Sequence, residues 1–298
     1  MGRKTHRWPG RRVTAAAAAV AASAALLAAC ARQAPPGTPD VRATKAFEAV
    51  FGQLPPVDAP GPVFATVAYF PSAREPGKFR PAPLFSAEPG AEERLTVRTV
   101  IRGIAGAGDF SEEIASPFPA GSDLAAFSVA GGVATVVVGG PFRADGLSAE
   151  RRAAAARALA LTVAQFGNAR EVDVSDASGT AHFRGTADGA ATADIGPPEV
   201  LGLVAVREKD DEPPSVLSAL FDRPVTVEEI AFFAPGGTDP VPGKVYATGF
   251  GMAAELHPDA TAVLETPGPW RVRLAVRDGK GRRTSGERSF VPRAVTHG

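Results

Sequence analysis

The first thirty residues follow a pattern of basic, then apolar, then small positions. The apolar run is rich in alanine, ends at Leu27, and is roughly 15 residues long, shorter than the ~20 residues of a permanent membrane helix. Small residues then precede Cys30, the one cysteine of the chain. This order is typical of an export signal, and we predict a signal peptide over residues 1–29. Its basic residues are Arg3, Lys4, Arg7, Arg11 and Arg12.

A tether with a short helix is expected over residues 30–60. The segment 31–40 contains three prolines and a glycine, which predicts an extended tether. Asp40 is the predicted cap of a helix that ends at Gly52. The apolar stripe of this helix either packs on the following domain, the favoured interpretation, or binds a partner. It consists of Phe47, Val50, Phe51 and Leu54.

Residues 61–185 combine strand and helix patterns. A run of β-formers predicts a strand at 62–70, and a connection rich in proline and glycine follows at 71–89. Acids in the first turn and an apolar stripe predict a helix from Glu92 that ends in the glycine run 103–108. These glycines follow a helix and precede no Lys-Ser/Thr, so they indicate a helix exit rather than a phosphate-binding loop.

The next pattern is a hairpin followed by a helix. Two β-rich runs at 124–129 and 133–138 meet at two glycines, and the second is apolar on both faces, which indicates a central strand covered by a helix. Ser148 is the predicted cap of a helix reaching about Phe166, and a last strand follows at 169–174. This order predicts an α+β fold with helices on one face of a mixed sheet.

The last third of the chain has a different pattern. Residues 186–198 are the predicted linker, and residues 294–298 a tail. Between them, short strands alternate with turns, and Asp278-Gly279-Lys280-Gly281 predicts a hairpin. This regular spacing predicts a β-sandwich over residues 199–293. The expected strands are 199–207, 224–233, 244–256, 261–265, 270–277 and 288–291.

The segment Leu27-Ala28-Ala29-Cys30 resembles the lipobox of bacterial lipoproteins. The resemblance implies cleavage before Cys30, a thioether from its sulfur to diacylglycerol, and a membrane anchor of fatty acids such as palmitate. Because Ala31 is not an aspartate, we expect the outer membrane in a cell with two membranes, or the outer face of the cytoplasmic membrane in a cell with one. An ordinary secretory signal is the alternative, and Arg11-Arg12 fits twin-arginine export poorly.

Four segments between Phe64 and His182, about 40% of the chain, resemble the GerMN domain of spore germination and sporulation lipoproteins. That family is non-enzymatic, so the resemblance implies a binding or scaffold role and no catalytic residue. The segment 101–108 departs from the family's helix exit. The matching segments are Val67-Ala68-Tyr69-Phe70-Pro71, Ser116-Pro117-Phe118-Pro119-Ala120-Gly121-Ser122, Gly132-Val133-Ala134-Thr135-Val136, and Leu161-Thr162-Val163-Ala164-Gln165-Phe166 before Val172.

The run 267–282 resembles the late strands of immunoglobulin-like (Ig-like) bacterial modules, which often follow a GerMN domain. The chain is therefore expected to hold a GerMN-like α+β domain at 61–185 and an Ig-like β domain at 199–293.

Composition excludes some functions. Hydrophobic residues make up 45% and charged residues 21% of the chain, which is not a disordered composition. The signal holds five of the 32 basic residues, so 27 remain against 32 acids, a balance of about −5. A mildly acidic body argues against nucleic acid as a partner. With one cysteine, the fold has no internal disulfide.

The sequence predicts no catalytic residue, metal site or cofactor. His182 and His257 are isolated and lack metal-ligand spacing, so we expect exposed loop histidines. The loop 173–179 lacks the ligand order of a calcium site. Adjacent acids cannot face one site from one regular element and are assigned to solubility; they are Glu112-Glu113, Asp210-Asp211 and Glu228-Glu229.

Two features of the last domain have competing interpretations. The arginines at 271, 273 and 277 form either a basic stripe for an acidic glycan or lipid headgroup or, as nearby Glu265, Asp278 and Glu287 favour, a solvated face. Trp270 either stacks on a sugar or, more commonly, belongs to the core.

We therefore expect a lipid-anchored, extracytoplasmic, non-enzymatic binding or scaffold protein of the cell envelope, in sporulation, germination or envelope signalling. Its expected partners are the membrane, through Cys30, and an envelope protein or wall polymer. The ligand-binding residues are not predicted. A small-ligand or glycan module, with a concave aromatic-lined pocket, is the first rival. An envelope hydrolase, with two acids in a deep cleft, is the second.

Overall fold

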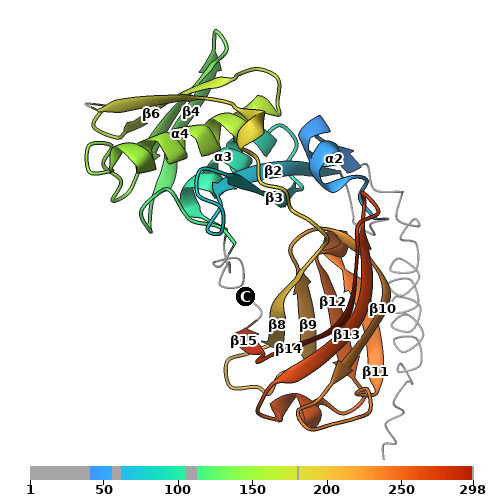
Figure 1. Cartoon of the computed structure of the whole chain (residues 1–298). Coiled ribbons are helices and arrows are strands. Elements are labelled where there is room, and N and C mark those ends of the chain that lie inside the picture. Colours follow the sequence, from blue (N-terminus) through green and yellow to red (C-terminus); the bar gives the residue numbers. More distant parts are fainter. Residues whose placement is uncertain (1–40, 56–61, 105–112, 180, 297–298) are drawn as a thin grey trace, which may run out of the picture. The chain divides into compact units, whose positions relative to one another are not determined.

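The computed structural model describes residues 41–55, 62–104, 113–179 and 181–296 (Figure 1). The predicted signal peptide, the tether, Asp40 and most of the glycine run lie outside these ranges. The first described element is β1 (Val41–Ala43), which pairs in parallel with β2 (Val63–Pro71). The helix that follows, α2 (Lys45–Phe51), is capped by Thr44, whose Oγ1 accepts the N–H of Phe47 at 3.1 Å. The prediction of Asp40 as the cap is therefore wrong, because three strand residues separate it from the helix.

The first hydrophobic core lies among two sheets and three α-helices, and this α+β class is as predicted. One sheet has the order β1-β2-β3 and the other β4-β5-β6-β7, and each contains both parallel and antiparallel pairs. The remaining elements of this part are β3 (Phe79–Ser86), α3 (Glu92–Arg102), β4 (Asp123–Ala130), β5 (Val133–Gly139), α4 (Ala149–Ala164), β6 (Glu171–Asp176) and β7 (His182–Thr186).

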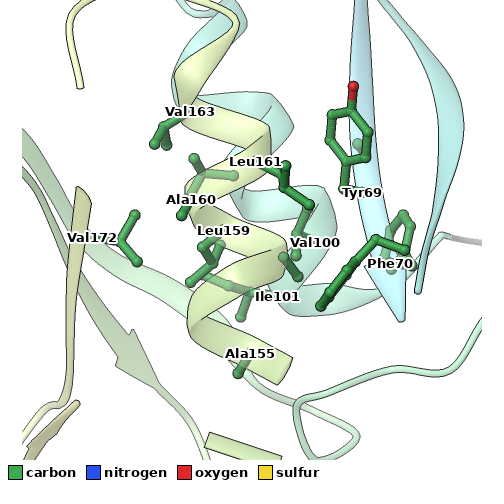
Figure 2. Packing of buried hydrophobic residues seen from close by; sticks show 14 of the residues in the cluster. Tyr69, Phe70, Val100, Ile101, Ala155, Leu159, Ala160, Leu161, Val163 and Val172 are labelled. Atoms are coloured by element: carbon green, nitrogen blue, oxygen red, sulfur yellow. The ribbon is translucent and has the colours of Figure 1, made fainter. Parts of the chain in front are cut away.

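Helices α3 and α4 contact strands of both sheets, whereas we predicted one sheet with helices on one face. Figure 2 shows Leu159 of α4 between Val172 of β6 and Phe70 of β2. The reason lies in the composition of α4, which is apolar around most of its circumference and therefore buries more than one face. Its buried residues are Ala155, Ala156, Ala158, Leu159, Ala160, Leu161, Thr162 and Val163.

The predicted hairpin is confirmed as β4 and β5, and β5 is an inner strand of its sheet. Only one face of β5 is buried, through Ala134, Val136 and Val138, while Thr135 on the other face is exposed. The predicted inner position is therefore confirmed, although the run that looks apolar on both faces in the sequence is buried on one face. Ser148 caps α4 as predicted, accepting the N–H of Arg151 at 3.3 Å.

Besides β1, two strands of this part were not predicted. Strand β3 lies inside the predicted connection 71–89, where Pro81 and Pro83 argue against a strand. Prolines are tolerated there because β3 ends the sheet order and has one neighbouring strand. Strand β7 follows the predicted last strand, and its Gly185 lies against Ala156 of α4.

The second hydrophobic core lies between two sheets with the orders β10-β13-β14 and β11-β12-β9-β8-β15. Trp270 is the largest side chain buried in it. The predicted hairpin at 278–281 is confirmed as the turn between β13 and β14. The strands are β8 (Val200–Arg207), β9 (Val216–Phe221), β10 (Val225–Phe233), β11 (Gly243–Thr248), β12 (Ala253–Pro258), β13 (Trp270–Asp278), β14 (Arg283–Phe290) and β15 (Arg293–Thr296).

The expectations for this part need correction: β9 was not predicted, β14 begins five residues before the predicted strand 288–291, and β15 lies largely in the predicted tail and pairs with β8. The predicted strand 244–256 is two strands, because the 3-10 turn η2 (Gly249–Gly251) interrupts it. The predicted strand 261–265 is the 3-10 helix η3 (Thr261–Glu265). The predicted linker contains the 3-10 turn η1 (Gly189–Ala191), and its apolar residues are buried; they are Ala191, Ala193 and Ile195.

Candidate functional site

Cys30, the predicted lipidation site, lies outside the described residues, so its surroundings are not part of the structure. Within the described ranges, none of the helices is long and apolar enough to cross a bilayer.

The two histidines have exposed side chains, as predicted, but they lie in strands and not in loops: His182 begins β7 and His257 belongs to β12. His182 is 55% exposed, with Nε2 3.0 Å from the carbonyl oxygen of Gly179 and Nδ1 3.5 Å from Asp173. His257 is 46% exposed and lies 3.6 Å from Glu255. Among the described residues, neither belongs to a group of three side chains that could hold a metal ion.

The predicted arginine stripe is an ion-paired strand face. Arg271 contacts Glu287 at 2.8 Å, Arg273 contacts Glu229 at 3.6 Å, and Arg277 contacts Glu228 at 3.1 Å. The guanidinium groups of Arg271 and Arg273 also lie 5.0 and 5.3 Å from the ring centre of Phe233. These contacts favour the solvated-face interpretation over a glycan or headgroup site. Of the acids expected nearby, only Glu287 pairs with the stripe.

Trp270 is 1% exposed and belongs to the second core. Stacking on a sugar needs an accessible ring face, so the core interpretation holds for this residue.

A buried network of charges was not predicted. Arg223 is fully buried; its Nε lies 3.1 and 3.0 Å from the two carboxylate oxygens of Asp222, and its Nη1 lies 3.5 Å from Asp278. Its Nη1 and Nη2 also donate to the carbonyls of Gly196 and Ile195 at 2.9 and 2.5 Å. From the first core, Arg80 reaches Asp222 at 3.0 Å. The charged groups are paired with one another and with backbone carbonyls, so loss of one partner is expected to destabilise the fold, and Arg223 has no unpaired donor to offer a ligand.

Nothing in the sequence marks Asp222-Arg223 as buried, because an adjacent acid and base before a strand usually indicates a solvated turn. Its burial depends on the carbonyls of the segment 195–196, which reach it from 27 and 28 residues away.

The largest hollow described is a groove at one end of the two-sheet part, with a volume of about 580 Å³. Its walls come from the β8–β9 loop, the chain after η3, and the β14–β15 connection. Leu264 and Trp270 are among its lining residues but are only 7% and 1% exposed, so they offer a ligand little surface, whereas Val291 at the groove is 73% exposed. This groove is the candidate ligand-binding site. Four prolines line it: Pro213, Pro214, Pro267 and Pro292.

Charged groups in the groove are only partly neutralised. Glu212 pairs with Lys209 at 2.7 Å, and Arg207 donates to the carbonyl of Asp210 at 3.0 Å. Within the described part of the chain, Asp211 and Glu265 have no ion pair or hydrogen bond from their carboxylates. The groove therefore presents two unpaired negative charges beside the exposed Val291 and four prolines, an arrangement that suits a ligand with cationic and apolar groups.

Comparisons with known proteins add little. No protein-family model matches the chain, and no curated protein matches it. Among solved structures, the tandem GerMN domains of the sporulation protein GerM from Bacillus subtilis are similar, with 10% sequence identity and a TM-score of 0.33. The match covers 54% of this chain and 59% of that one, so the chain spans less than two thirds of that structure. The likeness is weak.

Proposed function

We propose that the protein is a bacterial lipoprotein, anchored through Cys30 to the extracytoplasmic face of a membrane. The observation that carries the proposal is the placement of the sole cysteine directly after Leu27-Ala28-Ala29, at the end of a basic and then apolar leader. One acyl chain anchors a protein only marginally, whereas diacylglycerol supplies two chains and holds it firmly.

Behind the anchor, we propose a non-enzymatic binding or scaffold protein of the cell envelope, acting in sporulation, germination or envelope signalling. The α+β part is proposed to be GerMN-like, on the sequence segments that resemble that domain, and the two-sheet part to be an Ig-like module. An envelope protein or a wall polymer is the proposed partner. The mildly acidic body argues against nucleic acid.

Fractionation of cells that express Cys30→Ser tests the anchor. The variant is expected in the soluble extracytoplasmic fraction and should take up no labelled palmitate, because the acceptor sulfur is gone. Ala31→Ser is the matched control, since it adds the same hydroxyl one residue later and keeps the cysteine. Membrane retention of Cys30→Ser equal to that of Ala31→Ser would contradict the proposal.

A ligand-binding module is the second candidate, and the groove with unpaired Asp211 and Glu265 favours it. A photo-crosslinking amino acid at Val291, in the anchored protein, tests this function. It should capture one partner or ligand that the same group at Ser289, on the exposed strand β14, does not capture. Equal capture at both positions would contradict the proposal that the groove is a ligand-binding site.

A further inference from the structure

Strand β11 (Gly243–Thr248) is the last strand of the five-stranded sheet and has β12 on one side only, among the described residues. Five of its six residues are exposed. Val245 is 39% exposed and Tyr246 is 50% exposed, and these neighbours point to opposite faces of the sheet. The strand contains no proline, and its pairing with β12 runs without a bulge. It therefore has few of the features that protect edge strands from pairing.

The pairing with β12 determines which backbone groups of β11 face the open edge. Opposite residues of an antiparallel pair alternate between hydrogen-bonded and non-hydrogen-bonded pairs. Pro242 accepts the N–H of Asp259 at 3.0 Å, which makes that pair hydrogen-bonded. The next pair, Gly243 with Pro258, is then non-hydrogen-bonded, as suits a proline that has no N–H.

Continuing the alternation, Lys244 and Tyr246 direct their backbone groups toward β12. Gly243, Val245 and Ala247 direct theirs away from the sheet, toward solvent. Among the described residues, the open edge therefore presents three residues with a free N–H and a free C=O, spaced evenly around Val245.

We propose that β11 pairs with β11 of a second copy of this chain, antiparallel and with Val245 on the two-fold axis. A two-fold axis through Val245 places residues that lie equally far before and after Val245 opposite each other. Val245 therefore faces Val245 of the other copy, and Gly243 faces Ala247. This register uses all three outward-facing residues at once, and each pair exchanges two N–H···O bonds, about six in total. If one strand were shifted by one residue, the outward-facing backbone groups of one copy would lie opposite inward-facing groups of the other. A shift by two residues would lose one hydrogen-bonded pair.

The side chains complement one another in the same register. On one face, Val245 meets its own copy, flanked by the small residues Gly243 and Ala247. On the other face, Lys244 of one copy lies opposite Tyr246 of the other, a cation beside an aromatic ring. Tyr246 is opposite Glu255 on β12, so the lysine and that glutamate share one cross-strand row. No two like charges lie directly opposite each other, and every outward-facing backbone group finds a partner in this register, which favours a second copy as the occupant.

Disulfide trapping with purified full-length chain tests the register, in a Cys30→Ser background that removes the only native thiol. Lys244→Cys and Tyr246→Cys are made as separate variants, one carrying a size tag, and oxidised alone or mixed. Positions 244 and 246 of different copies form a non-hydrogen-bonded pair with Cα atoms ≈ 4.5 Å apart, within disulfide range. Position 244 of one copy and position 244 of the other are diagonal neighbours, ≈ 7–8 Å apart, and the same holds for position 246. The mixture should therefore give several-fold more linked dimer than either variant alone.

The mass of the Cys30→Ser protein in analytical ultracentrifugation gives the second measurement. A dimer is expected that Val245→Pro converts to a monomer, because proline removes one of the outward N–H groups on the axis. Ser289→Pro, on edge strand β14, is the matched control and should leave the dimer intact. A monomer at all concentrations, a dimer that survives Val245→Pro, or no excess of linked dimer in the mixture would overturn the proposal. A β11 that pairs with a different protein would give that first result.

Discussion

Gln165 binds both backbone groups of Val67. Its Oε1 accepts the N–H of Val67 at 2.9 Å, and its Nε2 donates to the C=O of the same residue at 2.7 Å. One turn earlier on α4, Thr162 accepts the N–H of Tyr69 at 3.2 Å. Strand β1 pairs with β2 only as far as Ala65, so these side chains satisfy the part of β2 that no strand covers. Both belong to the segment that resembles the GerMN helix, and the geometry gives them a structural role.

Gln165→Ala should lower the free energy of unfolding by about 2–4 kcal/mol, because it leaves a buried N–H and C=O of Val67 without partners. Urea denaturation measures this change. Asn168→Ala is the control, since the amide of Asn168 is exposed and bonds only Glu93, and it should change stability by about 0.5 kcal/mol or less. Equal losses in the two variants would contradict the role assigned to Gln165.

Arg223→Met should destabilise the protein by about 1–3 kcal/mol, because Asp222 and Asp278 keep only Arg80 and Arg282 as cationic partners and the carbonyls of Ile195 and Gly196 lose their donor. The same substitution at Arg273 removes an ion pair whose side chains are 52% and 62% exposed. That change should cost about 0–1 kcal/mol. Thermal and urea unfolding of both variants measure the difference, and a loss below about 1 kcal/mol for Arg223→Met would show that the network adds little.

Gly185→Ala tests the contact of β7 with α4. A Cβ at this position would lie 2.6 Å from the Cβ of Ala156 and 2.9 Å from its carbonyl carbon. We expect a loss of about 1–3 kcal/mol, as for other overpacked sites. Gly139→Ala is the control, because its Cβ would lie 3.4 Å from that of Ala125. Chemical denaturation should separate the two variants; a neutral Gly185→Ala would mean that the two elements lie farther apart.

The pair formed by Arg98 and Asp123 should make stability depend weakly on acid pH. The guanidinium donates to both carboxylate oxygens, at 2.8 and 2.7 Å, and these bonds hold the pKa of Asp123 well below its usual value. A lowered folded-state pKa contributes stability above the unfolded pKa of about 3.9, and this contribution is lost as the pH falls below it. The side chains are 42% and 39% exposed, so solvent screens the effect and keeps it small.

Comparison of the native chain with Asp123→Asn checks this dependence. The native chain should be the more stable at pH 6, and its advantage should shrink by pH 3. An advantage that stays constant or grows as the pH falls would contradict the assignment.

Local patterns predicted the elements that depend on neighbouring residues. The hairpin of β4 and β5, the helix capped by Ser148 and the turn at 278–281 follow from spacing, caps and glycines. Elements that depend on distant contacts were missed. Strand β3 contains two prolines and exists because β2 pairs with it, and the split of 244–256 follows from the positive φ of Phe250, at 63°. The domain limits at 61–185 and 199–293 stay predictions.

The candidate site was predicted only in part, for the same reason. The exposure of the two histidines follows from their isolation, and the solvated face of the arginine stripe follows from the alternation of arginine with apolar residues. The pairing of the stripe with Glu228 and Glu229 was not predicted. The groove has no sequence signal, because three connections far apart in the chain form it. The burial of Asp222-Arg223 likewise depends on distant backbone carbonyls, which the sequence does not identify.

Mass spectrometry of the N-terminal peptide, from protein extracted from the membrane fraction, tests the central claim most directly. We predict that the mature chain begins at Cys30 and carries the mass of a diacylglyceryl group on that residue. A chain that begins at another residue, or a Cys30 with a free thiol in membrane-bound protein, would contradict the lipoprotein assignment.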